Sequence, residues 1–132
     1  MTEYDLNAIV TPYVTSYIRE KTVQKDELLR EIEKYAEENA VPIAEPETAQ
    51  LLSVITKLVR PERVLEVGCA IGYSSILMAR SLKPGGSILT LEYDKDMIEL
   101  ARGNIKKAGL EDTICVREAD ARDYLWYIDE DE

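Results

Sequence analysis

The sequence predicts an α/β fold in which a parallel sheet of three strands follows a helical N-terminal segment. From residue 63 onward, short apolar runs alternate with helical patterns, and the turns between them are short. Strands that alternate with helices in this way pair in parallel through right-handed crossovers. A chain of 132 residues fits one domain. We therefore expect a single domain over 1–132, with a helical segment over 1–44 and a βαβαβ half over 45–132.

The region from Thr2 to about Asn39 is polar and predicts two amphipathic helices. Tyr13, Tyr17 and Ile18 recur at helical spacing in the first. The second carries an apolar stripe of Leu28, Leu29, Ile32, Tyr35 and Ala36. A short link over 40–44 follows.

A third helix is predicted to begin at residues 45–47, because proline is favoured at the first helical position, and to end before Pro61. Its buried face is expected to consist of Leu51, Leu52, Ile55, Leu58 and Val59.

The alternating half is predicted element by element from its apolar runs and turn residues. Strands are expected over 63–67, 87–91 and 113–117, and helices over 73–82, 95–108 and 120 to about 128. Residues 83–86 form a turn. Asp94 is a plausible N-cap of the helix over 95–108, and Gly109 is its C-terminal stop.

Composition excludes several classes of function. A net charge of −10 opposes a broad nucleic-acid interface, and the absence of histidine removes histidine-based acid–base chemistry and histidine metal ligands. No apolar run approaches the roughly 20 residues of a membrane span. The N-terminus lacks a signal region, and two cysteines, Cys69 and Cys115, do not make a disulfide framework. We expect a cytoplasmic protein that contacts no membrane.

The segment from Gly68 to Gly72 lies where an open α/β sheet binds its ligand, at the carboxyl end of a strand. A dinucleotide site would show G-x-G-x-x-G, but its first glycine position is occupied here by Glu66, whose charge repels a pyrophosphate. This disfavours an NAD-dependent oxidoreductase. An acid suits a cationic ligand such as S-adenosylmethionine, which carries an ammonium and a sulfonium. Alternatively, Glu66 only satisfies local backbone groups and the glycines only form a turn.

The ends of the next two predicted strands strengthen the first interpretation. Glu92 follows Gly68 by twenty-four residues, where an acid in a Rossmann-like unit binds ribose hydroxyls. At the third strand end, Asp120 can accept from an adenine amino group and the small Ala121 lets the backbone meet the adenine edge. The three strand ends together predict a Rossmann-like site for S-adenosylmethionine.

The segment 64–75, Val-Leu-Glu-Val-Gly-Cys-Ala-Ile-Gly-Tyr-Ser-Ser, resembles class I methyltransferases. The most similar group is the cation-dependent O-methyltransferases related to catechol and caffeoyl-CoA O-methyltransferase. Residues 41–43, 48–52 and 106–110 agree with it, and the helix over 31–38 is most similar to bacterial members, some of which methylate 5-hydroxyuridine in tRNA. The resemblance covers roughly residues 25–127.

The resemblance implies roles for individual residues. Glu66, Gly68, Gly72 and Ser74 would hold the methionyl part of the cofactor. Glu92 would bind the ribose, Asp120 with Ala121 the adenine, and Val41 would lie over the cofactor as part of a lid. Tyr73 would either support the loop or only fill space.

The family's Mg²⁺ site and proposed lysine base lie on a fourth strand and later residues, so no metal or catalytic residue is assigned. We expect a chain cut after the third strand, because it ends at Glu132, just before the family's fourth strand would begin. The acids 129–132 do not match the metal motif. Val64, Leu65 and Val67 would then lie at an exposed apolar edge, which favours pairing or homodimerisation.

The resemblance implies an O-methyltransferase that uses S-adenosylmethionine and, in the complete family, Mg²⁺. Its acceptor would be a small hydroxylated molecule or a tRNA uridine. The alternative is a cofactor-binding or regulatory module without catalytic activity.

Overall fold

The computed structural model describes residues 11–126, and its first half consists of three helices, as the sequence predicts. They are α1 (Pro12–Lys21), α2 (Glu27–Glu38) and α3 (Pro46–Val59). The side chain of Asp26 caps α2 by accepting a hydrogen bond from the Leu29 N–H. Proline stands at the start of both α1 and α3.

The second half is the predicted parallel sheet. Strands β1 (Arg63–Val67), β2 (Ser87–Glu92) and β3 (Ile114–Glu118) lie in the order β1-β2-β3. All pairs are parallel, and Val64 stands beside Ile88, which stands beside Ile114. The crossovers contain α4 (Tyr73–Ala79) and α5 (Lys95–Ala108), and the short α6 (Ala121–Tyr124) follows β3. The Rossmann-like fold class is therefore confirmed.

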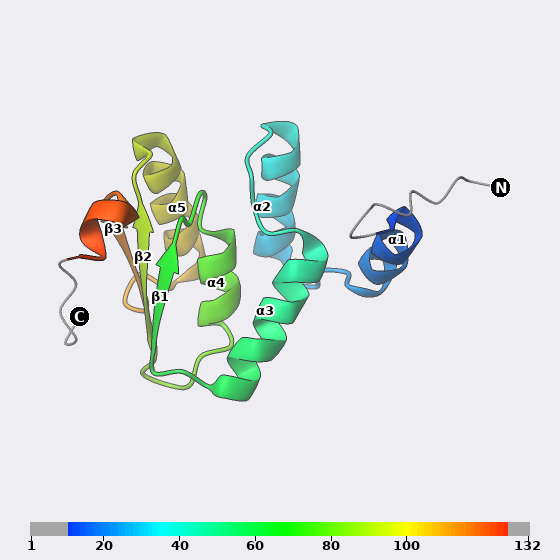
Figure 1. Cartoon of the computed structure of the whole chain (residues 1–132), viewed down its shortest axis with the longest axis horizontal. Helices are drawn as coiled ribbons and strands as arrows, with labels where there is room; N and C mark the ends of the chain where they lie inside the picture. Colours follow the sequence, from blue (N-terminus) through cyan, green and yellow to red (C-terminus); the bar gives the residue numbers. More distant parts are fainter. Residues whose placement is uncertain (1–10, 127–132) are drawn as a thin grey trace.

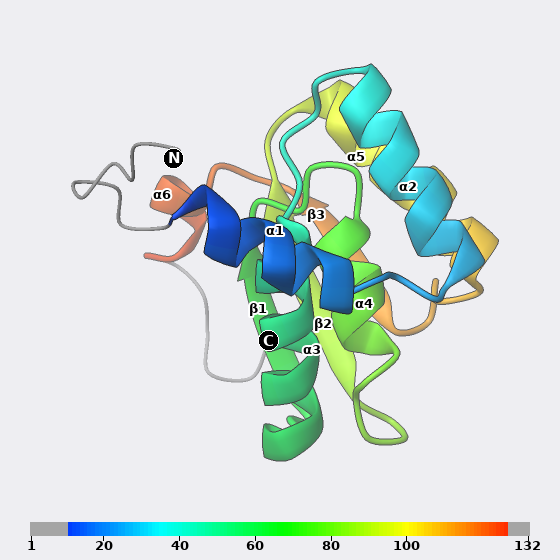
Figure 2. The same cartoon turned by 90° about the vertical axis from the view of Figure 1, so that its right-hand side faces the viewer.

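Helices α1 to α5 form layers on one side of the sheet. Figure 1 shows the sheet at the left, α4 and α5 beside it, α2 and α3 farther out, and α1 at the far end. Figure 2 looks at the same layers from the α1 side, with the strands behind the helices. The core lies between the sheet and α2, and its most buried large side chains are Leu29, Ile71, Tyr73, Ile76 and Ile88. No helix within residues 11–126 is long and apolar enough to cross a membrane.

Element boundaries follow local signals closely where such signals exist. The Asp94 carboxylate caps α5 by accepting from the Asp96 and Met97 N–H groups, and Gly109 ends it with a φ of 66°. Both predictions are confirmed. The predicted helix over 73–82 ends earlier, at Ala79, because the chain tightens there and the Ser81 N–H bonds to the Met78 carbonyl at 2.8 Å. The helix predicted from residue 120 is a single turn, α6, up to the last described residues.

The predicted buried face of α3 is wrong. Leu51, Ile55, Leu58 and Val59 are exposed, and Leu52 alone of that group is partly buried. The helix instead buries its small and hydroxylated residues, Ala49, Ser53 and Thr56, and packs mainly against α4 and α1. Helical spacing identified residues that share a face, but it does not say whether another element covers that face.

Candidate functional site

The turn between β1 and α4, residues 68–72, is a tight loop with unusual backbone geometry, hereafter the glycine loop. Its φ angles are +79° at Gly68, +45° at Ala70 and +84° at Gly72, a region that glycine adopts at low cost. The Gly68 N–H donates to the Leu91 carbonyl at 2.8 Å, and the Asn104 amide donates to the Ile71 carbonyl at 2.9 Å. The loop is therefore fixed from both β2 and α5.

Glu66 lies at the carboxyl end of β1, on the face of the sheet that carries α4. One carboxylate oxygen accepts from the Ser74 hydroxyl at 2.5 Å, and the other accepts from the Ser75 hydroxyl, which is fully buried. Within residues 11–126, the side-chain donors to Glu66 are therefore two hydroxyl groups of α4. Two such donors fix the orientation of a carboxylate next to the glycine loop.

Glu92 ends β2 and reaches across to the glycine loop. Its side chain is buried, and one oxygen accepts from the Ala70 N–H at 3.0 Å. The other accepts from the N–H groups of Tyr93 and Asp94 at 2.9 and 3.1 Å. A carboxylate offers about four acceptor positions, so three bonds leave capacity for a further donor. Thr90 is the residue that stands beside Glu66 in the sheet, and Glu92, two residues farther along β2, lies next to the same loop.

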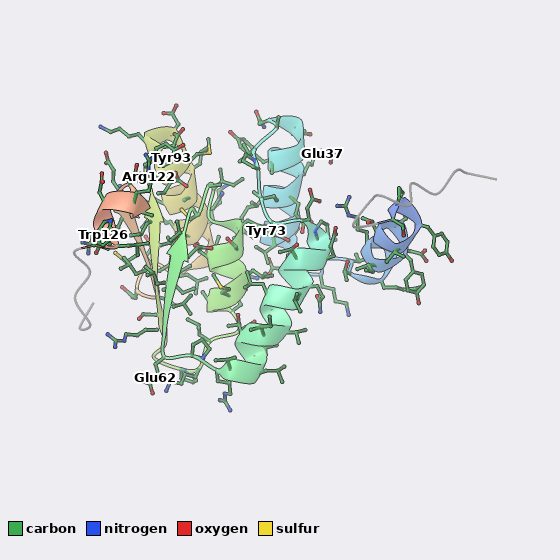
Figure 3. All side chains as sticks on the ribbon, in the orientation of Figure 1. Glu37, Glu62, Tyr73, Tyr93, Arg122 and Trp126 are labelled. Carbon is green, nitrogen blue, oxygen red and sulfur yellow. The ribbon has the colours of Figure 1, made fainter. Side chains whose placement is uncertain are left out.

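Asp120 occupies the third strand end, where it caps α6 by accepting from the Arg122 N–H at 2.9 Å. The guanidinium of Arg122 also pairs with this carboxylate, at 2.6 Å for its shortest contact. Hydrogen bonding to Arg122 lowers the pKa of Asp120 to about 2. In Figure 3, Arg122 lies beside Tyr93 at the upper end of the sheet. Ala121, the first residue of α6, is partly buried.

Val41 lies in the link between α2 and α3. Its N–H donates to the Ala36 carbonyl at 2.9 Å, and its side chain packs against the core. In Figure 1 the link descends from the upper end of α2, on the side that faces the carboxyl ends of β1 and β2. Val41 also lines a cavity of about 750 Å³ between the link and the first two helices. The link thus approaches the glycine loop from the helical side.

Three supporting contacts were missed by the sequence analysis. Ser75 holds the Glu66 carboxylate, and Asn104 holds the glycine loop. The buried Tyr73 hydroxyl donates to the Glu33 carboxylate of α2. Figure 3 places Tyr73 between α4 and α2. Burial, followed by the bond to Glu33, raises the pKa of Tyr73. The spacing of these residues in the sequence gives no signal, because each pair is brought together by helix packing.

Within residues 11–126, no group of three or more cysteine, aspartate or glutamate side chains is placed to hold a metal ion. The acids 129–132 considered in the sequence analysis lie outside the described residues.

Known proteins are similar to this chain in sequence and in fold. A sequence model described as O-methyltransferase matches residues 19–132. Catechol O-methyltransferase of Niastella koreensis is 35% identical over 103 residues, which are 77% of this chain and 47% of that protein. Caffeoyl-CoA O-methyltransferase of Stellaria longipes is 30% identical over 125 residues, 92% of this chain and 52% of that protein.

A solved structure agrees with these relatives. The O-methyltransferase from Bacillus cereus, solved in complex with SAH, has a TM-score of 0.77 and 32% identity. That match covers 91% of this chain and 55% of the Bacillus chain. The chain thus spans about half the length of the relatives it matches. The sequence model that matches residues 19–132, together with the similar fold, shows that the chain belongs to the O-methyltransferase family.

Proposed function

We propose that residues 1–132 act as one S-adenosylmethionine-binding domain of an O-methyltransferase. The observation that carries this proposal is the pair of carboxylates, Glu66 and Glu92, at adjacent strand ends on either side of the glycine loop. Two negative charges at this place favour a cation and oppose a pyrophosphate. The Bacillus cereus neighbour, which was solved with SAH, supports the same ligand class.

Residues at each of the three strand ends would bind a different part of the ligand. The Glu66 carboxylate, oriented by Ser74 and Ser75, would attract the ammonium of the methionyl part near Gly68 and Gly72. Glu92 retains acceptor capacity for a ribose hydroxyl. Asp120 and Ala121 would face the adenine, and Val41 would limit access of water from the link.

S-adenosylmethionine, when bound, would supply a sulfonium methyl group: the acceptor's hydroxyl oxygen would bond to the methyl carbon as the carbon–sulfur bond breaks, with S-adenosylhomocysteine leaving and the hydroxyl proton passing to water. For such a displacement the protein contributes mainly by positioning and by electrostatics. The two fixed carboxylates and the rigid loop fit that requirement. The described residues do not fit a Mg²⁺ site, so we assign them no step that requires a metal.

We infer that the acceptor is a small hydroxylated molecule. Support comes from relatives named for catechol and caffeoyl-CoA. A tRNA uridine is the other acceptor considered, and the net charge of −10 weighs against it, because a phosphate backbone would be repelled.

We further propose a cytoplasmic homodimer. Free cysteines, one of them the exposed Cys115, fit a reducing compartment. The outer face of α1 exposes Tyr13, Val14 and Tyr17, which a second copy would cover. Sedimentation should give a dimer at micromolar concentration. A monomer there would contradict the dimer without affecting the cofactor proposal.

The cofactor proposal is tested by titrating the folded chain with S-adenosylhomocysteine in a calorimeter. We expect saturable binding that weakens at least tenfold in Glu66→Gln, because the variant removes the charge and retains the shape. The matched control is Glu99→Gln, an exposed position on α5, which should bind like the unmodified chain. Absence of heat from a chain whose circular dichroism shows it to be folded would refute the proposal.

A further inference from the structure

A cavity of about 410 Å³ lies where the connection between α1 and α2 passes α3 and α4 (Figure 2). Sites for small molecules commonly have volumes of about 300–1,000 Å³. The lining residues belong to the chain over 21–25, to α2, to α3 and to the first two turns of α4. None of these described residues belongs to the proposed cofactor site, so the cavity is a separate feature of the helical side of the molecule.

Three exposed lysines, Lys21, Lys25 and Lys57, line this cavity, hereafter the lysine cavity. Within residues 11–126, Lys25 and Lys57 form no ion pair, and Lys21 forms an exposed pair with Glu20 at 3.3 Å, which contributes little. The chain has 26 acidic and only 16 basic side chains, so carboxylate partners are plentiful elsewhere. Three ammonium groups gathered at one cavity of an acidic protein favour an anionic ligand.

The inner wall of the lysine cavity is polar and buried. It contains Tyr73 and Ser53, which are 1% and 8% exposed. Glu33 is the one carboxylate among the described lining residues, and it accepts a hydrogen bond from the Tyr73 hydroxyl. The Gln24 amide oxygen accepts from the Asp26 N–H at 3.1 Å, which leaves the amide NH₂ group as a donor. The cavity therefore combines positive charge at its mouth with neutral hydrogen-bonding groups inside.

The kind of cation indicates which anion fits. Arginine binds a planar carboxylate through two parallel N–H donors, whereas lysine acts as a point charge and commonly binds phosphate. Within residues 11–126, the cavity is lined by lysine and by no arginine. A phosphate group carries about 1.5 to 2 negative charges at pH 7, which two or three ammonium groups can balance. The lining therefore favours a phosphate group over a carboxylate.

We propose that the lysine cavity binds a small phosphorylated molecule. The phosphate group lies among the ammonium groups of Lys21, Lys25 and Lys57, where the positive charge is concentrated. The rest of the molecule extends toward the polar inner wall, where Gln24 and Ser53 offer hydrogen bonds. This recognition uses none of the residues proposed to hold S-adenosylmethionine, so it can be tested in the absence of the cofactor.

The probe is inorganic phosphate, titrated into the full 132-residue chain and followed by the NMR shifts of backbone amides. We expect saturable shifts at residues 21–25 and 57, and binding at least fivefold tighter than that of malonate, a dicarboxylate of similar charge. Lys25→Gln and Lys57→Gln should each weaken phosphate binding at least fivefold, because each removes one charge and retains most of the side chain. The control is Lys95→Gln, which removes the same charge from an exposed position on α5, outside the cavity, and should bind like the unmodified chain.

Three outcomes would overturn the proposal. The first is a folded chain whose amides at 21–25 and 57 do not shift saturably with phosphate. The second is an equal loss of affinity in Lys57→Gln and Lys95→Gln, because binding would then follow net charge and not the cavity. The third is malonate binding as tight as phosphate binding, which would leave an unselective group of cations. None of these outcomes affects the titration with S-adenosylhomocysteine.

Discussion

The Tyr73 hydroxyl, at the first position of α4, donates a hydrogen bond to the Glu33 carboxylate of α2, although forty residues separate them in the chain. Tyr73 is 1% exposed and Glu33 is partly exposed, so this bond lies at the edge of the core. It joins the end of the glycine loop to the helix whose Ala36 carbonyl holds the Val41 N–H. One buried contact thus connects the two sides of the proposed cofactor site.

Tyr73→Phe is expected to lower the free energy of unfolding by about 1–3 kcal/mol, since it removes a hydrogen bond to a charged group and leaves a partly buried carboxylate without that donor. Chemical denaturation measures the loss. Adding Glu33→Gln should recover part of it, because the residual charge is gone. The control Tyr17→Phe, at an exposed position on α1, should have little effect. Equal losses in both tyrosine variants would contradict the role of this bond.

The thiol of Cys69, within the glycine loop, should make stability fall at alkaline pH. Burial raises the pKa of Cys69 from 9.0 to about 12. Because the folded state holds this proton more tightly than the unfolded chain, the contribution is complete below pH 9 and is lost as pH rises toward 12. The slope is at most about 1.4 kcal/mol per pH unit.

The free energy of unfolding, measured by denaturation at several pH values between about 8 and 11, gives this slope, because the range brackets the ordinary pKa of a thiol. Cys69→Ala should flatten the dependence, whereas Cys115→Ala, at an exposed position, should retain it. An unchanged slope in Cys69→Ala would assign the effect to other groups.

The elements that the sequence predicted best are those with local signals. The strand at 63–67 and the helix at 95–108 have the predicted bounds, and the helix owes them to Asp94 and Gly109, which act within one turn of its ends. The buried face of α3 was wrong because coverage depends on which element lies opposite, and that information is not local. Leu58 is 78% exposed although its spacing is that of a core residue.

The candidate site shows the same division. Positive φ angles at Gly68 and Gly72 agree with the turn that the glycines predicted. The donors that hold the two carboxylates could not be read from the sequence. Ser75 reaches Glu66 only because α4 packs on the sheet, and the Ala70 N–H reaches Glu92 only because the loop folds back over β2. Sequence motifs identify the chain positions, whereas their partners follow from packing.

The ion pair between Asp120 and Arg122 should be visible as an acid-shifted titration. Arg122→Ala is expected to return the pKa of Asp120 from about 2 toward its ordinary value of 3.8. The depressed pKa contributes stability above that ordinary value, and this contribution is lost as pH falls through about 2. Carboxyl-carbon NMR titration measures the shift. If Asp120 titrates at the same pH in both proteins, then the backbone N–H of residue 122, and not its guanidinium, lowers the pKa of Asp120.

The two glycines Gly68 and Gly85 form a matched pair that separates backbone strain from ligand binding. Their φ angles are +79° and +82°, and a Cβ added at either meets no atom within 4 Å. Gly85 lies in the turn before β2, so it is at the opposite end of the parallel sheet from the glycine loop. Alanine at either position should therefore cost a similar free energy of unfolding, about 1–2 kcal/mol, from the left-handed backbone alone.

Affinity for S-adenosylhomocysteine should separate the pair. In Gly68→Ala the added methyl group projects into the open space where the ligand backbone is proposed to lie, so calorimetry should show binding weakened at least tenfold. In Gly85→Ala the affinity should remain that of the unmodified chain, because only strain has been added. If both variants bind equally well while losing equal stability, then Gly68 serves the turn alone and the methionyl part lies elsewhere along the sheet edge.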